Sequence, residues 1–179
     1  MREFVRFAAS FLSVVALPLF AGEIPLGAHA PAFALVNPAD NATVGMNPSD
    51  GLVKVVVFTS HDCAASQQVE GRLTELANRY THRGVRFYAI DTRAAANADA
   101  PFPTLADPDR SVAHAYGATV TPEAFVIDGE GVVRYHGYID DDPSPAKRKA
   151  SPVLAALNAL LNGREAAAVE TKAYGCGVE

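Results

Sequence analysis

The stretch that decides the fold runs from Leu52 to Cys63 and reads Leu-Val-Lys-Val-Val-Val-Phe-Thr-Ser-His-Asp-Cys. Its first seven residues form a short, continuous and largely β-branched run, which is typical of a strand buried on both faces. A polar turn follows. From Cys63 the apolar residues recur at steps of three and four, so we expect a helix to about His82, ended by Gly84. A buried strand therefore delivers a cysteine to the start of a helix.

Strands and helices alternate along the rest of the chain, and 49% of its 179 residues are hydrophobic, enough for one well-buried core. The expected elements are a hairpin within Leu26–Gly51, strands at Val85–Asp91 and Phe102–Asp107, a short helix capped by Asp109 or Ser111 and ending at Tyr116, a strand pair at Glu123–Asp128 and Val132–Gly137, and a helix from Ser151 to about Asn162. The segment Thr92–Ala100 is expected to be a loop or weak helix, and Asp140, Asp141 and Asp142 a polar loop. This order predicts a mixed sheet with helices on both faces.

The first 22 residues have the pattern of an export signal. Arg2 and Arg6 precede an apolar run at 7–20, which is short for a membrane span, and small residues follow. An uncleaved, membrane-tethering signal and a buried N-terminal helix are the alternatives. We therefore predict a signal at 1–22, one domain at 23–163 and an extended tail at 164–179, in a protein that is periplasmic or extracellular.

The chain has two cysteines, Cys63 and Cys176. In an oxidising compartment they can form a purely structural disulfide that closes a long loop, and this alternative stands beside every redox interpretation. The formal net charge is −5 and there is no basic patch, so we expect no nucleic-acid partner. None of the five histidines has the close His/Cys spacing of a zinc site, and we expect no bound metal.

The position of Cys63 at the start of a helix favours reactivity. Unpaired backbone N–H groups and the positive end of the helix dipole stabilise thiolate over thiol. A thiolate attacks disulfides and peroxides. The alternative is a small, inert, buried cysteine.

Four motifs in order resemble the thioredoxin superfamily, and within it the redoxin branch of peroxiredoxins and peroxiredoxin-like proteins. They are the Gly-Ala-His-Ala-Pro-Ala-Phe-Ala-Leu of Gly27–Leu35, the strand and turn Val55–Cys63, Thr121-Pro122 with the strand after it, and Gly131–Gly137. The resemblance covers Leu26 to Gly163. It implies a thioredoxin-like α/β fold with a central mixed sheet, helices on both faces and an N-terminal hairpin extension.

The departures from the family patterns bear on function. Ser60 stands where thioredoxins carry their attacking cysteine, so a thioredoxin mechanism within this motif is not available. Cys63 matches the peroxide-attacking cysteine of peroxiredoxins, and Ser60 keeps the hydroxyl of their Thr. Val56, however, replaces their Pro, and no Arg precedes the strand after Pro122, although Arg93 or Arg110 could take its place in space.

The resemblance implies an exported thiol oxidoreductase that reduces a peroxide or a protein disulfide through Cys63. Ser60 would orient the oxidant, Thr121 and a cis Pro122 would shape the substrate groove, and Cys176, in a Gly-Cys tail, would act as resolving thiol. An external thiol would supply electrons, with no bound cofactor.

Other roles remain open at this point. His61 could assist the thiolate or bind substrate, or it could be a solvated turn residue, and Asp62 would oppose thiolate formation. The second hypothesis is a non-enzymatic binding module with a structural disulfide between Cys63 and Cys176. A weaker third is a copper chaperone that uses His61, Cys63 and a further ligand such as His114 or His136.

Overall fold

The computed structural model describes residues 22, 24–93, 100–144, 146–164, 166 and 169–178. The predicted export signal, apart from Gly22, and the centre of the Thr92–Ala100 segment lie outside these residues. Within them, no helix is both long enough and apolar enough to cross a membrane.

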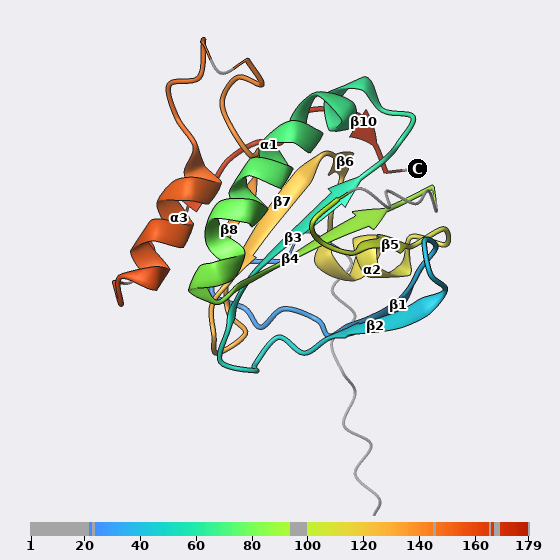
Figure 1. Ribbon diagram of the computed structural model, residues 1–179, viewed down its shortest axis with the longest axis horizontal. Helices are drawn as coiled ribbons and strands as arrows, with labels where there is room; N and C mark the ends of the chain where they lie inside the picture. Colours follow the sequence, from blue (N-terminus) through green and yellow to red (C-terminus); the bar gives the residue numbers. More distant parts are fainter. Residues whose placement is uncertain are drawn as a thin grey trace, which may run out of the picture.

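An eight-stranded mixed sheet forms the centre of the molecule (Figure 1), in the order β2-β1-β5-β4-β3-β7-β8-β9. Its strands are β1 (Phe33–Asn37), β2 (Ala42–Met46), β3 (Val53–Thr59), β4 (Val85–Asp91), β5 (Thr104–Ala106), β7 (Glu123–Ile127), β8 (Val133–Gly137) and β9 (Val169–Glu170). β3 lies in the middle, parallel to β4 and antiparallel to β7. The mixed sheet and the N-terminal β1–β2 hairpin confirm the predicted fold class.

The helices cover both faces of this sheet. They are α1 (Ala64–Tyr80), continued by the short η1 (Thr81–Arg83), then α2 (Ser111–Tyr116) and α3 (Pro152–Leu161). The apolar faces of α1 and α3 pack with alternate residues of β3, among them Val55 and Val57. The other residues of that strand, Val56 and Phe58, pack against α2 and the hairpin. The continuous apolar run in β3 follows from this burial on both faces.

The predicted cap of α2 is wrong. The N-cap residue is Arg110, in the left-handed region at φ 59°, and it makes no side-chain cap hydrogen bond. The buried Asp107 carboxylate instead accepts the N–H groups of Val112 (3.2 Å) and Ala113 (2.8 Å). Asp109 accepts the N–H of Ser111. A carboxylate one turn upstream thus satisfies the helix N–H groups that a residue at the cap position would normally bind.

The acidic loop is only partly solvated. Asp140 is buried, and its carboxylate lies 2.8 Å from both the Arg72 and the Arg148 Nε atoms. Asp141 is exposed, as expected for a polar loop. Two arginines from distant parts of the chain make this burial possible, because a buried carboxylate requires paired charge.

The C-terminal tail is extended and bound to the domain. β9 pairs in parallel with β8, and β10 (Cys176–Gly177) pairs antiparallel with β6 (Val120–Thr121). In Figure 1, β10 and β6 lie beside the N-terminal end of α1. Two short strand pairings therefore bring the second cysteine to the start of this helix.

Candidate functional site

Cys63 lies where β3 passes into α1. It is the N-cap residue, with extended backbone angles of φ −96° and ψ 117°. Its N–H donates to the Ser60 carbonyl, and its own carbonyl accepts the Gln67 N–H, each at 3.1 Å. The turn Ser60–Asp62 thus places the Cys63 side chain at the positive end of the helix dipole, which stabilises a thiolate.

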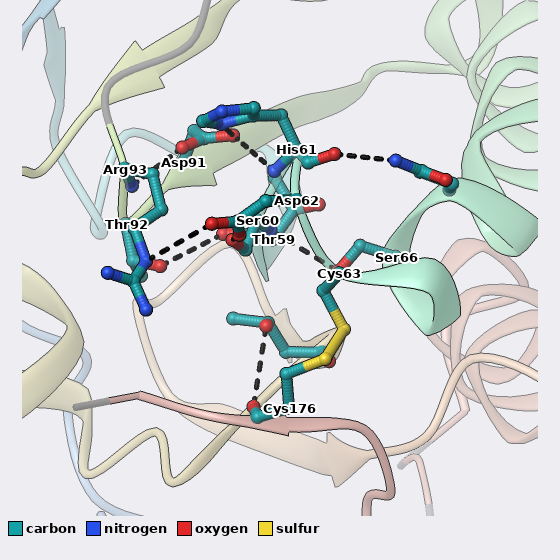
Figure 2. A network of polar contacts seen from close by, with 12 residues as sticks. Thr59, Ser60, His61, Asp62, Cys63, Ser66, Asp91, Thr92, Arg93 and Cys176 are labelled. Carbon is teal, nitrogen blue, oxygen red and sulfur yellow. Dashed lines mark hydrogen bonds and ion pairs between the residues drawn. A yellow bond between two sulfur atoms is a disulfide. The ribbon is translucent and has the colours of Figure 1, made fainter.

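Cys63 and Cys176 form a disulfide across 113 residues of sequence. The Cys63 Sγ also lies 3.3 Å from the Thr121 carbonyl oxygen, a packing contact because a disulfide sulfur carries no proton. The Thr121–Pro122 peptide is cis, as the family resemblance implied. Figure 2 shows both cysteines in one group with the turn that follows β3.

The backbone edge next to Pro122 is occupied by the tail. Cys176 pairs with Thr121 and Gly177 with Val120. The Thr121 hydroxyl donates to the Cys176 carbonyl at 3.4 Å, and the Val178 N–H donates to the Thr119 carbonyl at 3.1 Å. The edge that sequence reasoning assigned to a substrate is therefore covered, in the disulfide form, by the chain's own C-terminus.

The two cysteines of the disulfide have different surroundings. Cys63 is 1% exposed, at the N-cap position of α1. Cys176 is an exposed residue on a two-residue strand. Because attack on a disulfide requires access to the sulfur, we expect an external thiol to reach Cys176 more easily than Cys63.

The Ser60 hydroxyl does not point freely into the site. It donates a short hydrogen bond to the Asp62 carboxylate, and the Ser60 N–H donates to the Ser66 Oγ at 3.2 Å. This hydroxyl is the main cause that holds the pKa of Asp62 below its ordinary value, with further help from the charges of Arg93 and His61. For Ser60 to donate a hydrogen bond to an oxidant, its hydroxyl would have to be released from Asp62, although its oxygen can still accept one.

His61 lies at the rim of the site. Its side chain is 53% exposed, and its Nδ1 lies 3.6 Å from the Asp91 Oδ2. The buried Asp91 carboxylate also accepts the backbone N–H groups of His61 (2.9 Å) and Arg93 (2.7 Å). Sequence reasoning missed Asp91. Its position at the end of β4 was the available signal, because β3 and β4 are parallel and end at the same edge of the sheet.

Arg93 reaches this site. The Arg93 Nε lies 3.8 Å from the Asp62 Oδ2, on the same network in Figure 2. Arg110 instead stands at the start of α2. The structure therefore gathers the predicted residues at one end of the sheet, and their chemical roles stay predictions: Ser60, His61, Cys63, Thr121, Pro122 and Cys176.

Residues that hold the tail were also missed. The Thr171 Oγ1 accepts the Tyr138 N–H (3.2 Å) and lies 2.7 Å from the Tyr135 hydroxyl. At Gly137, a Cβ would lie 2.1 Å from the Thr171 carbonyl oxygen, and at Gly175 it would lie 2.0 Å from that of Thr121. The sequence signal of such close backbone packing was glycine itself: Gly175 in an apparently irregular tail and Gly137 at the end of a strand.

Metal chemistry has no support in the described part of the chain, which contains no group of three His, Cys, Asp or Glu residues able to hold a metal ion. His136, named above as a possible copper ligand, instead stacks on Phe125 and lies 3.9 Å from Glu123. Cys63 is bonded to sulfur. The copper-chaperone hypothesis therefore gains nothing from the geometry.

Known proteins share this fold and sequence pattern. A thiol:disulfide interchange protein DsbE of Allochromatium vinosum is 28% identical over 133 residues, covering 70% of this chain and 74% of that protein. The crystal structure of a conserved protein from Geobacillus kaustophilus is 29% identical with a TM-score of 0.78, covering 92% of this chain and 97% of that one. Mycobacterium tuberculosis AhpC, at 18% identity, shares the fold with a TM-score of 0.57 over 79% of this chain and 95% of its own.

The model of the AhpC/TSA family matches residues 26–136. This range contains the N-terminal hairpin, the strand and turn that end in Cys63, the cis Pro122, β7 and all of β8 except Gly137. The chain therefore belongs to the AhpC/TSA family.

Proposed function

We propose that this chain is an exported, peroxiredoxin-like thiol oxidoreductase in which Cys63 reacts with the oxidant and Cys176 resolves the product. One observation carries the proposal: a disulfide joins the buried N-cap residue of α1 to the exposed Cys176 of the tail, directly beside a cis-proline. Family membership and the thiol:disulfide interchange relative support thiol–disulfide chemistry in general.

A protein disulfide is the oxidant that the geometry favours. The Cys63 thiolate attacks one sulfur of the substrate disulfide, a new bond forms to that sulfur, and the other substrate sulfur leaves as thiolate. The Cys176 thiolate then attacks Cys63 and displaces the second substrate thiolate. The substrate disulfide is reduced, and Cys63 and Cys176 are oxidised to the bridge.

A peroxide is the second candidate oxidant. The Cys63 thiolate attacks one peroxide oxygen, the O–O bond breaks, and the other oxygen leaves and takes up a proton. The Cys176 thiol then condenses with the sulfenic acid and releases water. The Ser60 hydroxyl is hydrogen-bonded to Asp62, and Asp62 is paired with Arg93. The polar side chains that could assist a peroxide are therefore already bound to one another.

An external thiol completes either cycle. Because Cys176 is exposed and Cys63 is buried, the reductant attacks Cys176, and Cys63 leaves as a thiolate stabilised by the N-terminus of α1. A second thiol then frees Cys176. No group other than the two cysteines and an external thiol takes part in this electron transfer.

The alternative function is a non-enzymatic binding module. The observation that favours it is the tight packing of the tail, in which Gly175 contacts the Thr121 backbone and Val178 is buried. In that case the disulfide would be permanent, and it would stabilise the fold by as much as about 4–5 kcal/mol in the chain-entropy model for a loop of this length.

The deciding experiment is the oxidation of the pre-reduced protein by hydrogen peroxide and, separately, by a peptide disulfide. Cys63→Ser and Cys176→Ser are measured beside it, and the products are read by non-reducing mass spectrometry. Fast oxidation of Cys63 that ends in a readily reduced Cys63–Cys176 bridge supports the enzyme. A Cys63 that reacts no faster than free cysteine, or a bridge that resists reduction until the protein unfolds, supports the binding module.

Export rests on the sequence pattern at 1–22. We propose that this signal is removed, leaving a domain at 23–163 and the tail at 164–179 in a periplasmic or extracellular location. N-terminal sequencing of the protein from the exported fraction tests this. An intact N-terminus in the membrane fraction would indicate the uncleaved anchor instead.

A further inference from the structure

The tail binds the domain as an extended peptide would. Cys176 and Gly177 pair antiparallel with Thr121 and Val120, and the Val178 N–H extends the pairing to Thr119. The disulfide lies at the same place, because Cys176 is both paired with Thr121 and bonded to Cys63, and Figure 2 shows that sulfur–sulfur bond. The last residues thus have the arrangement of a ligand attached covalently to Cys63.

The residue before this cysteine lies too close to the domain for a side chain. A Cβ at Gly175 would lie 2.0 Å from the Thr121 carbonyl oxygen, 2.7 Å from its carbonyl carbon and 3.2 Å from the Pro122 Cδ. The two nearest atoms belong to the backbone, which cannot rotate away as a flexible side chain could. A strand that is paired with β6 and bonded to Cys63 therefore requires a glycine at this position.

Two of the anchors in the described part of the tail differ in how they depend on the disulfide. At Thr171, the N–H donates to the His136 carbonyl (3.1 Å) and the hydroxyl accepts the Tyr138 N–H (3.2 Å). The distal anchor consists of the two-residue pairing of β10, the buried Val178 and the disulfide. Reduction removes the covalent part of the distal anchor and leaves the one at Thr171 intact.

We propose that reduction frees the β6 edge and that this edge then selects cysteine peptides with glycine immediately before the cysteine. The tail acts as an intramolecular copy of the substrate: it occupies the edge in the disulfide form and leaves it in the dithiol form. This inference rests on the proposed function, and it adds the sequence class of the thiol partner.

The step that carries the selection is thiol–disulfide exchange. The Cys63 thiolate attacks the peptide sulfur of a mixed disulfide, a Cys63–peptide bond forms, and the original partner sulfur leaves as thiolate with the electron pair of the broken bond. In the resulting adduct the peptide cysteine takes the position of Cys176, and the residue before it takes that of Gly175.

The test uses the pre-reduced full chain with Cys176→Ser, so that the adduct on Cys63 persists. The probes are the peptide Tyr-Gly-Cys-Gly-Val and its versions with Ala or Val before the cysteine, each carrying thionitrobenzoate as leaving group. Release of the coloured thiolate gives the rates, which are divided by those of the same probes with a free cysteine. We expect the Gly peptide to react at least about tenfold faster than the Val peptide, with Ala between them.

Tyr is kept in all three peptides, because the corresponding Tyr174 packs on the ring of Tyr138 and its hydroxyl donates to the Asp140 carbonyl at 3.5 Å. Equal rates for Gly, Ala and Val peptides would overturn the inference and leave the proposed function standing. Slow reaction of all peptides beside fast reaction of a small aromatic disulfide would show that the tail is not released, which also overturns it. A Cys63 that reacts slowly with every disulfide would overturn the proposed function itself.

Discussion

The two cysteines of one disulfide lie in unlike parts of the molecule. Cys63 is held by β3 on one side and by a 17-residue helix on the other, and it is almost fully buried. Cys176 is an exposed residue on a two-residue strand that pairs only with the two residues of β6. The difference teaches that a buried residue held by the core and an exposed residue held by a short strand pairing can share one bond, and we expect an incoming thiol to attack the sulfur of the exposed residue.

The largest expected effect concerns which sulfur is attacked. When the oxidised protein is treated with a small monothiol and quenched by alkylation, the adduct should lie on Cys176 rather than Cys63 by roughly a hundredfold, because attack requires an accessible sulfur. Peptide mapping by mass spectrometry measures the ratio. Adducts distributed evenly over both cysteines would remove the contrast between the two sulfurs.

A change in the tail alone should shift the disulfide equilibrium. Gly175→Ala places a Cβ against the Thr121 backbone, so the tail must move and the bridge should become easier to reduce by about tenfold or more against a dithiol buffer. Gly71→Ala in α1, where a Cβ meets nothing within 4 Å, is the matched control and should leave the equilibrium unchanged. A Gly175→Ala protein with the wild-type equilibrium would contradict the close approach.

The anchor that does not depend on the disulfide should contribute to stability. Thr171→Val removes the hydroxyl that accepts the Tyr138 N–H and contacts the Tyr135 hydroxyl, at a cost of about 1 kcal/mol in the free energy of unfolding. Urea unfolding of the oxidised protein measures the loss. Thr171→Ser keeps the hydroxyl and should recover most of it; equal losses in both variants would point to the methyl group instead.

The smallest effect concerns the charge beside Cys63. The Ser60 hydroxyl and the Arg93 charge hold the pKa of Asp62 below its ordinary value of 3.8, so Asp62 is ionised throughout the range in which a thiol titrates. This negative charge disfavours the thiolate, and Asp62→Asn should lower the pKa of the reduced Cys63 thiol by about half a unit, a small change because Asp62 is well solvated.

The rate of alkylation by iodoacetamide as a function of pH measures that thiol pKa. Asp40→Asn, an exposed carboxylate in the N-terminal hairpin, is the control and should not move the profile. A pKa that rises in Asp62→Asn would mean that loss of the partner for Ser60 outweighs the removed charge. Asp62 also contributes to the stability of the fold. Because folding lowers its pKa, this contribution is present above about pH 4 and is lost as the pH falls below that value.

Much of the fold followed from local patterns. Hydrophobic periodicity and turn residues lie in neighbouring positions of the chain and can be recognised there. They predicted the strand before Ser60, the helix that begins after Cys63 and the strand pair after Pro122. The start of α2 was not predicted correctly, because Asp107 satisfies its N–H groups from outside the positions that local rules consider.

By itself, the sequence determined the family's fold, the place of Cys63 at the start of α1 and the cis Pro122, since each depends on residues close together in the chain or on a motif of fixed spacing. Tertiary structure alone decided that Ser60 is bound to Asp62, that Asp140 is buried between two arginines, and that the tail lies along β6. The pairing of the tail and the Arg72–Asp140 contact join distant segments, and strands of two residues have no period from which pairing can be recognised. Ser60 and Asp62 are only two residues apart, but a local pattern does not give the direction in which their side chains point. The glycine at position 175 acquires its meaning only when the Thr121 backbone, more than fifty residues away in sequence, is brought against it.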